Sequence, residues 1–136
     1  PSTKTFQALR IFVNKEISEL IKGIINATKF LKPGGKIIVV SFHSIEDKIV
    51  KYFFSNFSKD SSRPSRYLPE KNSDNIALFE KYKNKILKAS NYELKKNNPS
   101  RSAKLRYAIR SDNKFIYPEN FIEKFNFYLK LETINV

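Results

Sequence analysis

The residues of this chain best suited to chemistry lie in one short stretch, Ser41-Phe42-His43-Ser44. A mostly β-branched run at 36–42 predicts a buried strand, and a helical pattern begins directly after it. Ligands of α/β proteins usually bind just beyond the carboxyl ends of parallel strands. His43 is the chain's single histidine, and an imidazole at such a corner can act as a hydrogen-bond donor, a base or a stacking surface. The stretch is therefore a candidate ligand corner.

The same corner also has a purely structural interpretation, which the sequence leaves open. Ser44, Glu46 and Asp47 fit the Ser-x-x-acid pattern of a helix start, in which the hydroxyl accepts from free backbone N–H groups. The two acids also suit the positive end of the helix dipole. Capping alone is enough to explain Ser44 and Asp47, whereas His43 is balanced between a hydrogen-bonded structural role and contact with a ligand.

A second candidate site lies at 97–106, which reads NNPSRSAKLR. Arg101, Lys104 and Arg106 place three cations within six positions, and serine hydroxyls lie between them. Such a loop can hold phosphates by charge and by hydrogen bonds. The competing interpretation is an ordinary solvated flank of a hairpin. A further candidate for phosphate contact, SSRPSR at 61–66, has the composition of a surface loop.

Composition narrows the class of protein. The 26 Lys and Arg residues outnumber the 13 Asp and Glu residues, and the net charge of +13 favours a polyanionic partner such as nucleic acid. The absence of cysteine excludes disulfides and cysteine-bound metals, and a single histidine excludes a histidine-rich metal site, so no metal is predicted. No apolar run approaches the roughly 18 residues of a membrane span. These features predict a cytoplasmic protein that is not bound to membranes. The chain has no methionine, and we expect it to be a fragment of a larger protein.

Hydrophobic periodicity predicts one long helix at 5–31, ended by the Pro-Gly-Gly turn at 33–35. The strand at 36–42 shows no alternation, so both of its faces are expected to be covered, as in a parallel sheet. The strand at 103–110 does alternate, and its basic residues are assigned to an outer, solvent-facing side. The remaining predictions are a helix at 45–58, a flexible loop at 59–76, an irregular strand at 77–89, helical turns at 91–97 and a short helix in the tail at 112–136.

Three segments together resemble one family: TFQALRIFVNKE (5–16), LKPGGKIIVVSFHSIEDKIVKYFF (31–54) and NPSRSAKLRYAIR (98–110). They are similar to the MraW family of bacterial ribosomal RNA small-subunit methyltransferases (methyltransferase H). The resemblance covers most of residues 1–110. The last segment departs from the family pattern, because residues 97–101 either lack the family's first arginine or are one residue shorter.

The resemblance implies an α/β fold, namely part of a Rossmann-like methyltransferase sheet. Its expected parts are a long helix, a parallel strand, a helix and a closing antiparallel strand pair in which the last strand is inserted. Residues 1–111 would form the C-terminal part of the catalytic domain, and 112–136 a tail. The family uses S-adenosylmethionine to methylate N4 of a cytosine in 16S rRNA. The residues that bind this cofactor are expected in an N-terminal part outside the chain, so the chain alone is predicted to be inactive.

The resemblance also implies roles for individual residues. The expected partner is 16S rRNA or the small ribosomal subunit. A basic RNA-binding module without catalysis is the alternative function, and self-association through an exposed sheet edge or the first helix is expected. The residues expected to line the crevice near the target base, as catalytic residues, are Ser41, His43 and Ser44. Arg10 and Asn14 are expected to hold the corner together or to contact RNA. The residues expected to bind RNA phosphates are Arg101, Ser102, Lys104 and Arg106.

Overall fold

The structure, a computed structural model, describes residues 2–59 and 76–134. The flexible loop predicted at 59–76, with its SSRPSR motif, therefore lies almost entirely outside the described residues. The chain divides into two compact units. The first combines Pro1–Ala27 with Tyr117–Val136, and the second is Thr28–Ile116. The boundary predicted between 111 and 112 stays a prediction beside this division. No helix among the described residues is long and apolar enough to cross a membrane.

The prediction of one unbroken helix at 5–31 is wrong, because the chain turns at Asn14 and Lys15. Helix α1 covers Ser2–Val13 and helix α2 covers Glu16–Phe30. Lys15 has a φ of 54°, in the left-handed region that ends helices. The apolar periodicity continues across the turn, so the sequence pattern does not register the break. Arg10 braces the turn through an ion pair with Glu16, with Nε and Oε1 3.1 Å apart.

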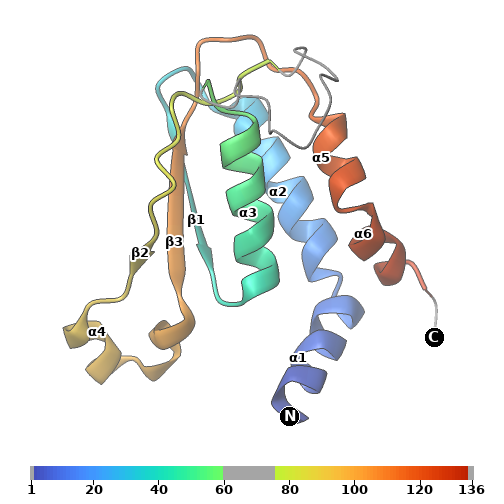
Figure 1. Cartoon of the computed structure of the whole chain (residues 1–136), viewed down its shortest axis with the longest axis vertical. Helices are drawn as coiled ribbons and strands as arrows, with labels where there is room; N and C mark the ends of the chain where they lie inside the picture. Colours follow the sequence, from blue (N-terminus) through green and yellow to red (C-terminus); the bar gives the residue numbers. More distant parts are fainter. Residues whose placement is uncertain (1, 60–75, 135–136) are drawn as a thin grey trace, which may run out of the picture. The chain divides into compact units, whose positions relative to one another are not determined.

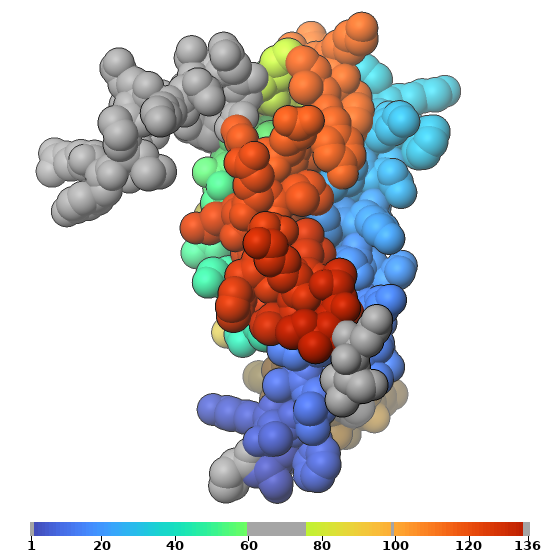
Figure 2. Space-filling view, turned by 90° about the vertical axis from the view of Figure 1, so that its right-hand side faces the viewer, coloured from blue at the N-terminus to red at the C-terminus, as the bar shows by residue number. Residues whose placement is uncertain are grey.

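The predicted helix in the tail is confirmed, and it consists of two short helices, α5 (Glu119–Lys124) and α6 (Asn126–Glu132). Phe121 and Phe125 are buried and meet edge to face, with ring centroids 5.6 Å apart. The Glu132 carboxylate accepts hydrogen bonds from the backbone N–H groups of Ile17 (2.8 Å) and Ser18 (3.1 Å). An anion at the first turn of α2 satisfies free donors and complements the helix dipole. Figure 2 shows the red C-terminal helices lying against the blue N-terminal ones within this first unit.

The second unit contains a three-stranded sheet in the order β1-β3-β2. Strand β1 is Lys36–Ser41, β2 is Leu87–Lys88 and β3 is Lys104–Ile109. The last strand, β3, lies between the other two and is antiparallel to both (Figure 1). The predicted closing antiparallel pair with an inserted last strand is thus confirmed. The described residues contain no parallel neighbour for β1, so the parallel part of the predicted sheet is not shown.

Helix α3 (Ser44–Asn56) packs on this sheet through an aromatic core. Phe79 contacts Phe53 and Phe54 edge to face, with ring centroids 5.3 Å and 5.2 Å away. The Phe79 backbone also bonds on both sides, donating to Phe57 O (3.0 Å) and accepting from Lys59 N (3.1 Å). The irregular strand predicted at 77–89 is therefore reduced to two isolated bridges at Phe79, one to Ser58 and one to Arg110, and to the two residues of β2. The helical turns predicted at 91–97 are confirmed as α4 (Asn91–Lys96), followed by the 3-10 helix η1 (Asn98–Ser102).

One face of β1 is open, contrary to the prediction that both faces are covered. Ile37 is buried, whereas Ile38 and Val40 on the opposite face are 59% and 47% exposed. Apolar side chains of α1, among them Phe6 and Val13, are exposed as well. Both surfaces are candidates for the predicted self-association, which remains a prediction. If either surface binds a second copy of the chain, light scattering on concentrated protein should detect a species heavier than the monomer. A strictly monomeric species would contradict the predicted self-association.

Candidate functional site

The corner between β1 and α3 is capped by His43 and not by Ser44. His43 has extended backbone angles (φ −141°, ψ 163°), and its Nδ1 accepts the Glu46 backbone N–H at 3.3 Å. Ser44 is the first helical residue, and it is exposed. The predicted Ser-x-x-acid cap is therefore wrong by one position. Its physical reason is that the helix starts at Ser44, so the residue before it takes the capping geometry.

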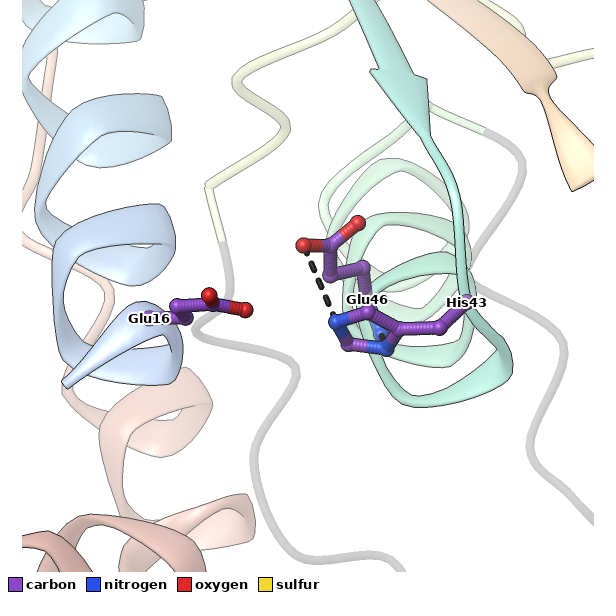
Figure 3. Close-up of side chains that lie close together, drawn as sticks. All are labelled: Glu16, His43 and Glu46. Carbon is purple, nitrogen blue, oxygen red and sulfur yellow. Dashed lines mark hydrogen bonds and ion pairs between the residues drawn. The ribbon is translucent and has the colours of Figure 1, made fainter. Parts of the chain in front are cut away.

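The His43 imidazole meets Glu46 at both nitrogens, but only the Nδ1 contact has hydrogen-bond geometry (Figure 3). Because Nδ1 accepts a backbone hydrogen bond, the proton of the neutral ring must lie on Nε2. Nε2 lies 3.0 Å from Oε1 of Glu46. The other oxygen of Glu46 accepts the Phe42 backbone N–H at 3.1 Å. The Nδ1 hydrogen bond orients the ring, and Glu46 lies at ion-pair distance from Nε2 without hydrogen-bond geometry, so at this corner His43 acts as a positioning group.

We expect His43→Ala to destabilise the protein by about 1 kcal/mol, the usual loss for removal of a helix cap. His43→Asn should keep most of the stability, because an amide oxygen can accept the same backbone N–H. Ser44→Ala, one residue further on, is the matched control and should change stability by less than about 0.5 kcal/mol. Urea unfolding followed by circular dichroism measures all three. A larger loss from Ser44→Ala than from His43→Ala would contradict this assignment of the cap.

Ser41 lies inside the sheet and not at its surface. It is 3% exposed, and its hydroxyl points to the Lys104 carbonyl at 3.5 Å. Lys104 is its register partner on β3. The Lys104 ammonium in turn lies 3.9 Å from Oδ2 of Asp47. Of the residues predicted to be catalytic, Ser41 thus supports the end of the sheet, whereas Ser44 is exposed.

The dominant interaction beside the corner is a buried ion pair between Asp47 of α3 and Arg106 of β3. Nε and Nη2 of Arg106 donate to the two oxygens of Asp47 at 2.7 Å and 3.0 Å, a bidentate geometry. Nη1 of Arg106 donates to Tyr82 Oη (3.0 Å) and Asn84 Oδ1 (2.8 Å). Arg106 is 2% exposed and Asp47 is 8% exposed. Every nitrogen of the guanidinium therefore donates to a side chain inside the protein.

The assignment of Arg106 to an outer, phosphate-binding face is therefore wrong. The alternation along β3 is present, but the basic side faces inwards and Tyr107 faces outwards. A charge can be buried when a partner compensates it, and here that partner is Asp47, 59 positions away. The sequence pattern assigns Asp47 only to the start of the helix, as the acid of the capping pattern and as a charge that suits the helix dipole. No local pattern connects the two residues.

The ion pair predicts how stability changes in acid. The hydrogen bond from Arg106 holds the pKa of Asp47 below its usual 3.8, and this effect outweighs the opposing effect of burial. Because the pKa is lower in the folded chain, the pair stabilises the protein fully above about pH 4. We expect that stabilisation to be lost as the pH falls through the folded pKa. Urea unfolding between pH 6 and pH 2 measures it. For Asp47→Asn, the free energy of unfolding should change less with pH below pH 4 than it does for the wild type. The same pH dependence in both proteins would contradict the link between the pair and acid stability.

A second buried cation, Arg110, was also placed on the outer face and is also inside. It is 5% exposed, with Nε donating to the Thr28 carbonyl at 3.2 Å. Its Nη1 donates to the carbonyls of Leu78 (3.1 Å) and Ser111 (3.0 Å). Arg110 thereby joins the end of α2, the segment before β2 and the end of β3. Its position on the same side of β3 as Arg106 is the only signal that the sequence offers.

Within the loop predicted to bind phosphate, the structure leaves some residues exposed and buries others. Arg101 and Ser102 are exposed on η1, whereas Ser100 is buried and donates to the Asn97 carbonyl at 2.6 Å. Beside this loop is an open hollow of about 180 Å³, mainly apolar, lined by Val40, Ala103, Leu105, Glu93 and residues 87–89. Arg10 and Asn14 belong to the first unit. Arg10 is engaged with Glu16 there, and contact of either residue with RNA stays a prediction.

Comparison with known proteins shows the family to which this chain belongs. Residues 1–111 match the family described as MraW methylase. A protein of Bartonella henselae is 48% identical over 119 residues, which are 88% of this chain and 34% of that protein. Proteins of Bartonella quintana (52% over 112 residues) and Parvibaculum lavamentivorans (47% over 112 residues) match 82% of this chain. All three are named ribosomal RNA small subunit methyltransferase H.

The second unit is thus the kind of mixed helix-and-strand structure expected of part of an α/β methyltransferase. The chain belongs to the MraW methylase family. It spans about a third of the length of the relatives that it matches.

Proposed function

We propose that the chain is the C-terminal portion of a cytoplasmic enzyme that transfers a methyl group from S-adenosylmethionine to N4 of a cytosine in 16S rRNA. The observation that carries this proposal is the family match over residues 1–111, with relatives about half identical that are named rRNA methyltransferases. The inserted β3 strand supports it, because this strand order is what the resemblance predicts for that part of the sheet.

The described residues do not fit a site for the cofactor. Binding of a nucleoside needs a close backbone approach, usually at a glycine-rich loop. Gly34, with φ +81°, and Gly35 both serve the turn between α2 and β1. A Cβ on Gly35 would lie 2.7 Å from Leu31 Cδ1, so this glycine is explained by the packing of the turn. We therefore assign the cofactor to the part of the enzyme outside this chain.

For this reaction the chain's contribution is positioning. S-adenosylmethionine supplies the methyl group, and the attacking amine must be held in line with it. We assign the corner of Ser41, His43 and Ser44 to the wall beside the target base. Within it, Ser44 is exposed to a ligand, His43 fixes the turn, and Ser41 fixes the end of β1 against β3. The ion pair of Asp47 and Arg106 supports this corner by joining α3 to β3.

The test is transfer of a radiolabelled methyl group to 16S rRNA. Two proteins are compared: the 136-residue chain alone, and a chimera in which the chain replaces the matching third of the Bartonella henselae relative. We expect no transfer by the chain alone and transfer by the chimera, with the unaltered relative as the positive control. Transfer by the chain alone would contradict the assignment of the cofactor site. A folded chimera that transfers nothing would contradict the proposed function.

The alternative function, a basic RNA-binding module without catalysis, is favoured by the charge of the chain. Eight cations and one acid fall within residues 81–104. If this alternative holds, salt-dependent RNA binding should survive His43→Ala but collapse when Arg101 and Lys104 are both replaced by Ala, and the chimera should be inactive.

A further inference from the structure

Much of the positive charge of the chain lies in one segment, residues 81–104, here called the basic arm. Its net charge is +7, within a total of +13 for the whole chain. The arm contains β2, α4 and η1 and leads directly into β3. Its only acid is Glu93. Its cations are Lys81, Lys83, Lys85, Lys88, Lys95, Lys96, Arg101 and Lys104.

Internal hydrogen bonds give the arm a defined shape. Ser90 caps α4, its hydroxyl accepting the Glu93 backbone N–H at 3.3 Å. At the other end, the Asn97 carbonyl accepts from the Ser100 hydroxyl at 2.6 Å and from its backbone N–H at 3.1 Å. The pairing of β2 with β3 attaches the arm to the sheet. The cations are therefore presented on a folded support.

The arm lies at the same end of the sheet as the candidate corner. Lys104 pairs with Ser41 of β1 on one side of β3 and with Lys88 of β2 on the other. Figure 1 shows α4 beyond the end of β2, at the end of the sheet where β1 turns into α3. A strand bound along the arm would therefore approach the corner that contains His43.

Apart from Lys104, the cations of the arm have no ion-pair partner in the part of the chain that the structure describes. All of its cations except Lys104 are exposed, and none of these exposed cations forms an ion pair within residues 2–59 and 76–134. Lys59 gives the contrast, because it lies 2.9 Å from Glu80 and 3.6 Å from Asp112. Unpaired like charges on one support repel one another, and a polyanion that tracks along them removes that repulsion.

The arm also carries an exposed aromatic ring. Tyr92 on α4 is 68% exposed, although its ring is large and apolar. The ammonium of Lys96 lies 4.5 Å from the ring centroid, so a cation and an aromatic face are presented together. Proteins that bind single-stranded nucleic acid combine these two elements, cations for the backbone and aromatic faces for unpaired bases.

We propose that the basic arm binds single-stranded RNA, with its lysines and Arg101 on the phosphates and Tyr92 stacked on an unpaired base. The proposal rests on the proposed function for its identification of the RNA as the methylation substrate, and it adds the surface that delivers the strand to the corner. Unpaired RNA suits this surface better than duplex RNA, because a stacking ring needs a base with a free face.

The test is fluorescence anisotropy with the full 136-residue chain and a labelled unpaired RNA of about 12 nucleotides, titrated at several salt concentrations. The arm variant replaces Lys85, Lys88, Lys95 and Lys96 by Ala. The control variant replaces four exposed lysines outside the arm by Ala: Lys22, Lys29, Lys114 and Lys130. The two variants have the same net charge. A difference in their RNA affinity therefore reports where the lysines lie and not how many have been removed.

We expect the arm variant to bind at least about 30-fold more weakly and to lose close to 3 units of salt slope, at about 0.7 for each lost phosphate contact. The control variant should lose less than about threefold. Equal losses from both variants would overturn the proposal. Circular dichroism checks that each variant is folded, and if the arm variant is not, the single variants Lys95→Ala and Lys96→Ala replace it.

Tyr92 tests the stacking contact separately. Tyr92→Leu should weaken binding of the unpaired RNA about tenfold, whereas Tyr92→Phe, which keeps the ring, should stay within about twofold. Equal affinity of the Leu and Phe variants, or tighter binding of a duplex of the same length, would overturn the single-strand proposal. Methyl transfer by the chimera is a separate readout. If the chimera is inactive but RNA binding depends on the arm, the proposed function is refuted and the proposal for the arm stands. If the chimera is active but RNA binding does not depend on the arm, the proposal for the arm is refuted and the proposed function stands.

Discussion

Asp47→Ala is expected to lower the free energy of unfolding by about 3–5 kcal/mol, because it leaves the Arg106 guanidinium buried without its counterion. Arg106 is 2% exposed, and two of its nitrogens donate to Asp47. The neutral partners Tyr82 and Asn84 accept only from Nη1, so they cannot replace the lost charge. Urea unfolding at pH 7 measures the change.

A double-mutant cycle separates the free energy lost with the ion pair from the cost of leaving the Arg106 guanidinium buried and unpaired. Arg106→Met alone should also be strongly destabilising, but Asp47→Ala combined with Arg106→Met should recover part of the loss, because no charge then remains buried. The matched control is Asp112→Ala, which removes an exposed carboxylate that lies 3.6 Å from the Lys59 ammonium. It should change stability by less than about 1 kcal/mol. A loss from Asp47→Ala no larger than that of the control would contradict the role assigned to the pair.

Elements marked by local patterns could be predicted from the sequence. Helix α3 follows from apolar residues spaced by three and four, and β1 follows from its β-branched run. Strand β3 follows from its alternation, and a helix is predicted in the tail, where the structure has two short ones. The break between α1 and α2 could not be predicted, because Lys15 adopts a positive φ without a glycine to signal it.

Sequence patterns located the candidate corner along the chain, but they did not predict the contacts that its residues make. The corner at His43 and the cations near β3 were identified, yet the roles within each changed. The cap is His43 and not Ser44, because the start of a helix is uncertain by a residue from sequence alone. The inner and outer faces of β3 were exchanged, since the rule that charges face solvent fails where a distant carboxylate compensates them. Pairing between residues 59 positions apart leaves no local trace.

Arg110→Met is expected to cost about 3 kcal/mol, although among the described residues its guanidinium meets only neutral oxygens. Its side chain donates to the carbonyls of Thr28, Leu78 and Ser111, and losing these charge-assisted hydrogen bonds is costly, although the Leu78 carbonyl keeps the Ser111 backbone N–H at 2.9 Å. Thr28 lies in the last turn of α2, where free carbonyls give a partial negative charge that favours a cation. The methionine fills similar space without donating, so the loss measures the hydrogen bonds more than the packing.

Arg110→Lys should fall between the wild type and Arg110→Met. It keeps the charge, but an ammonium has no planar fork that reaches the carbonyls of Thr28 and Leu78 together. Arg101→Ala is the matched control, because Arg101 is exposed on η1 and should contribute less than about 0.5 kcal/mol to folding. Urea unfolding ranks the variants, and hydrogen exchange of the Ser111 amide, which bonds to the Leu78 carbonyl at 2.9 Å, reports local opening. If Arg110→Met were as stable as Arg101→Ala, Arg110 could not be what joins α2, the segment before β2 and β3.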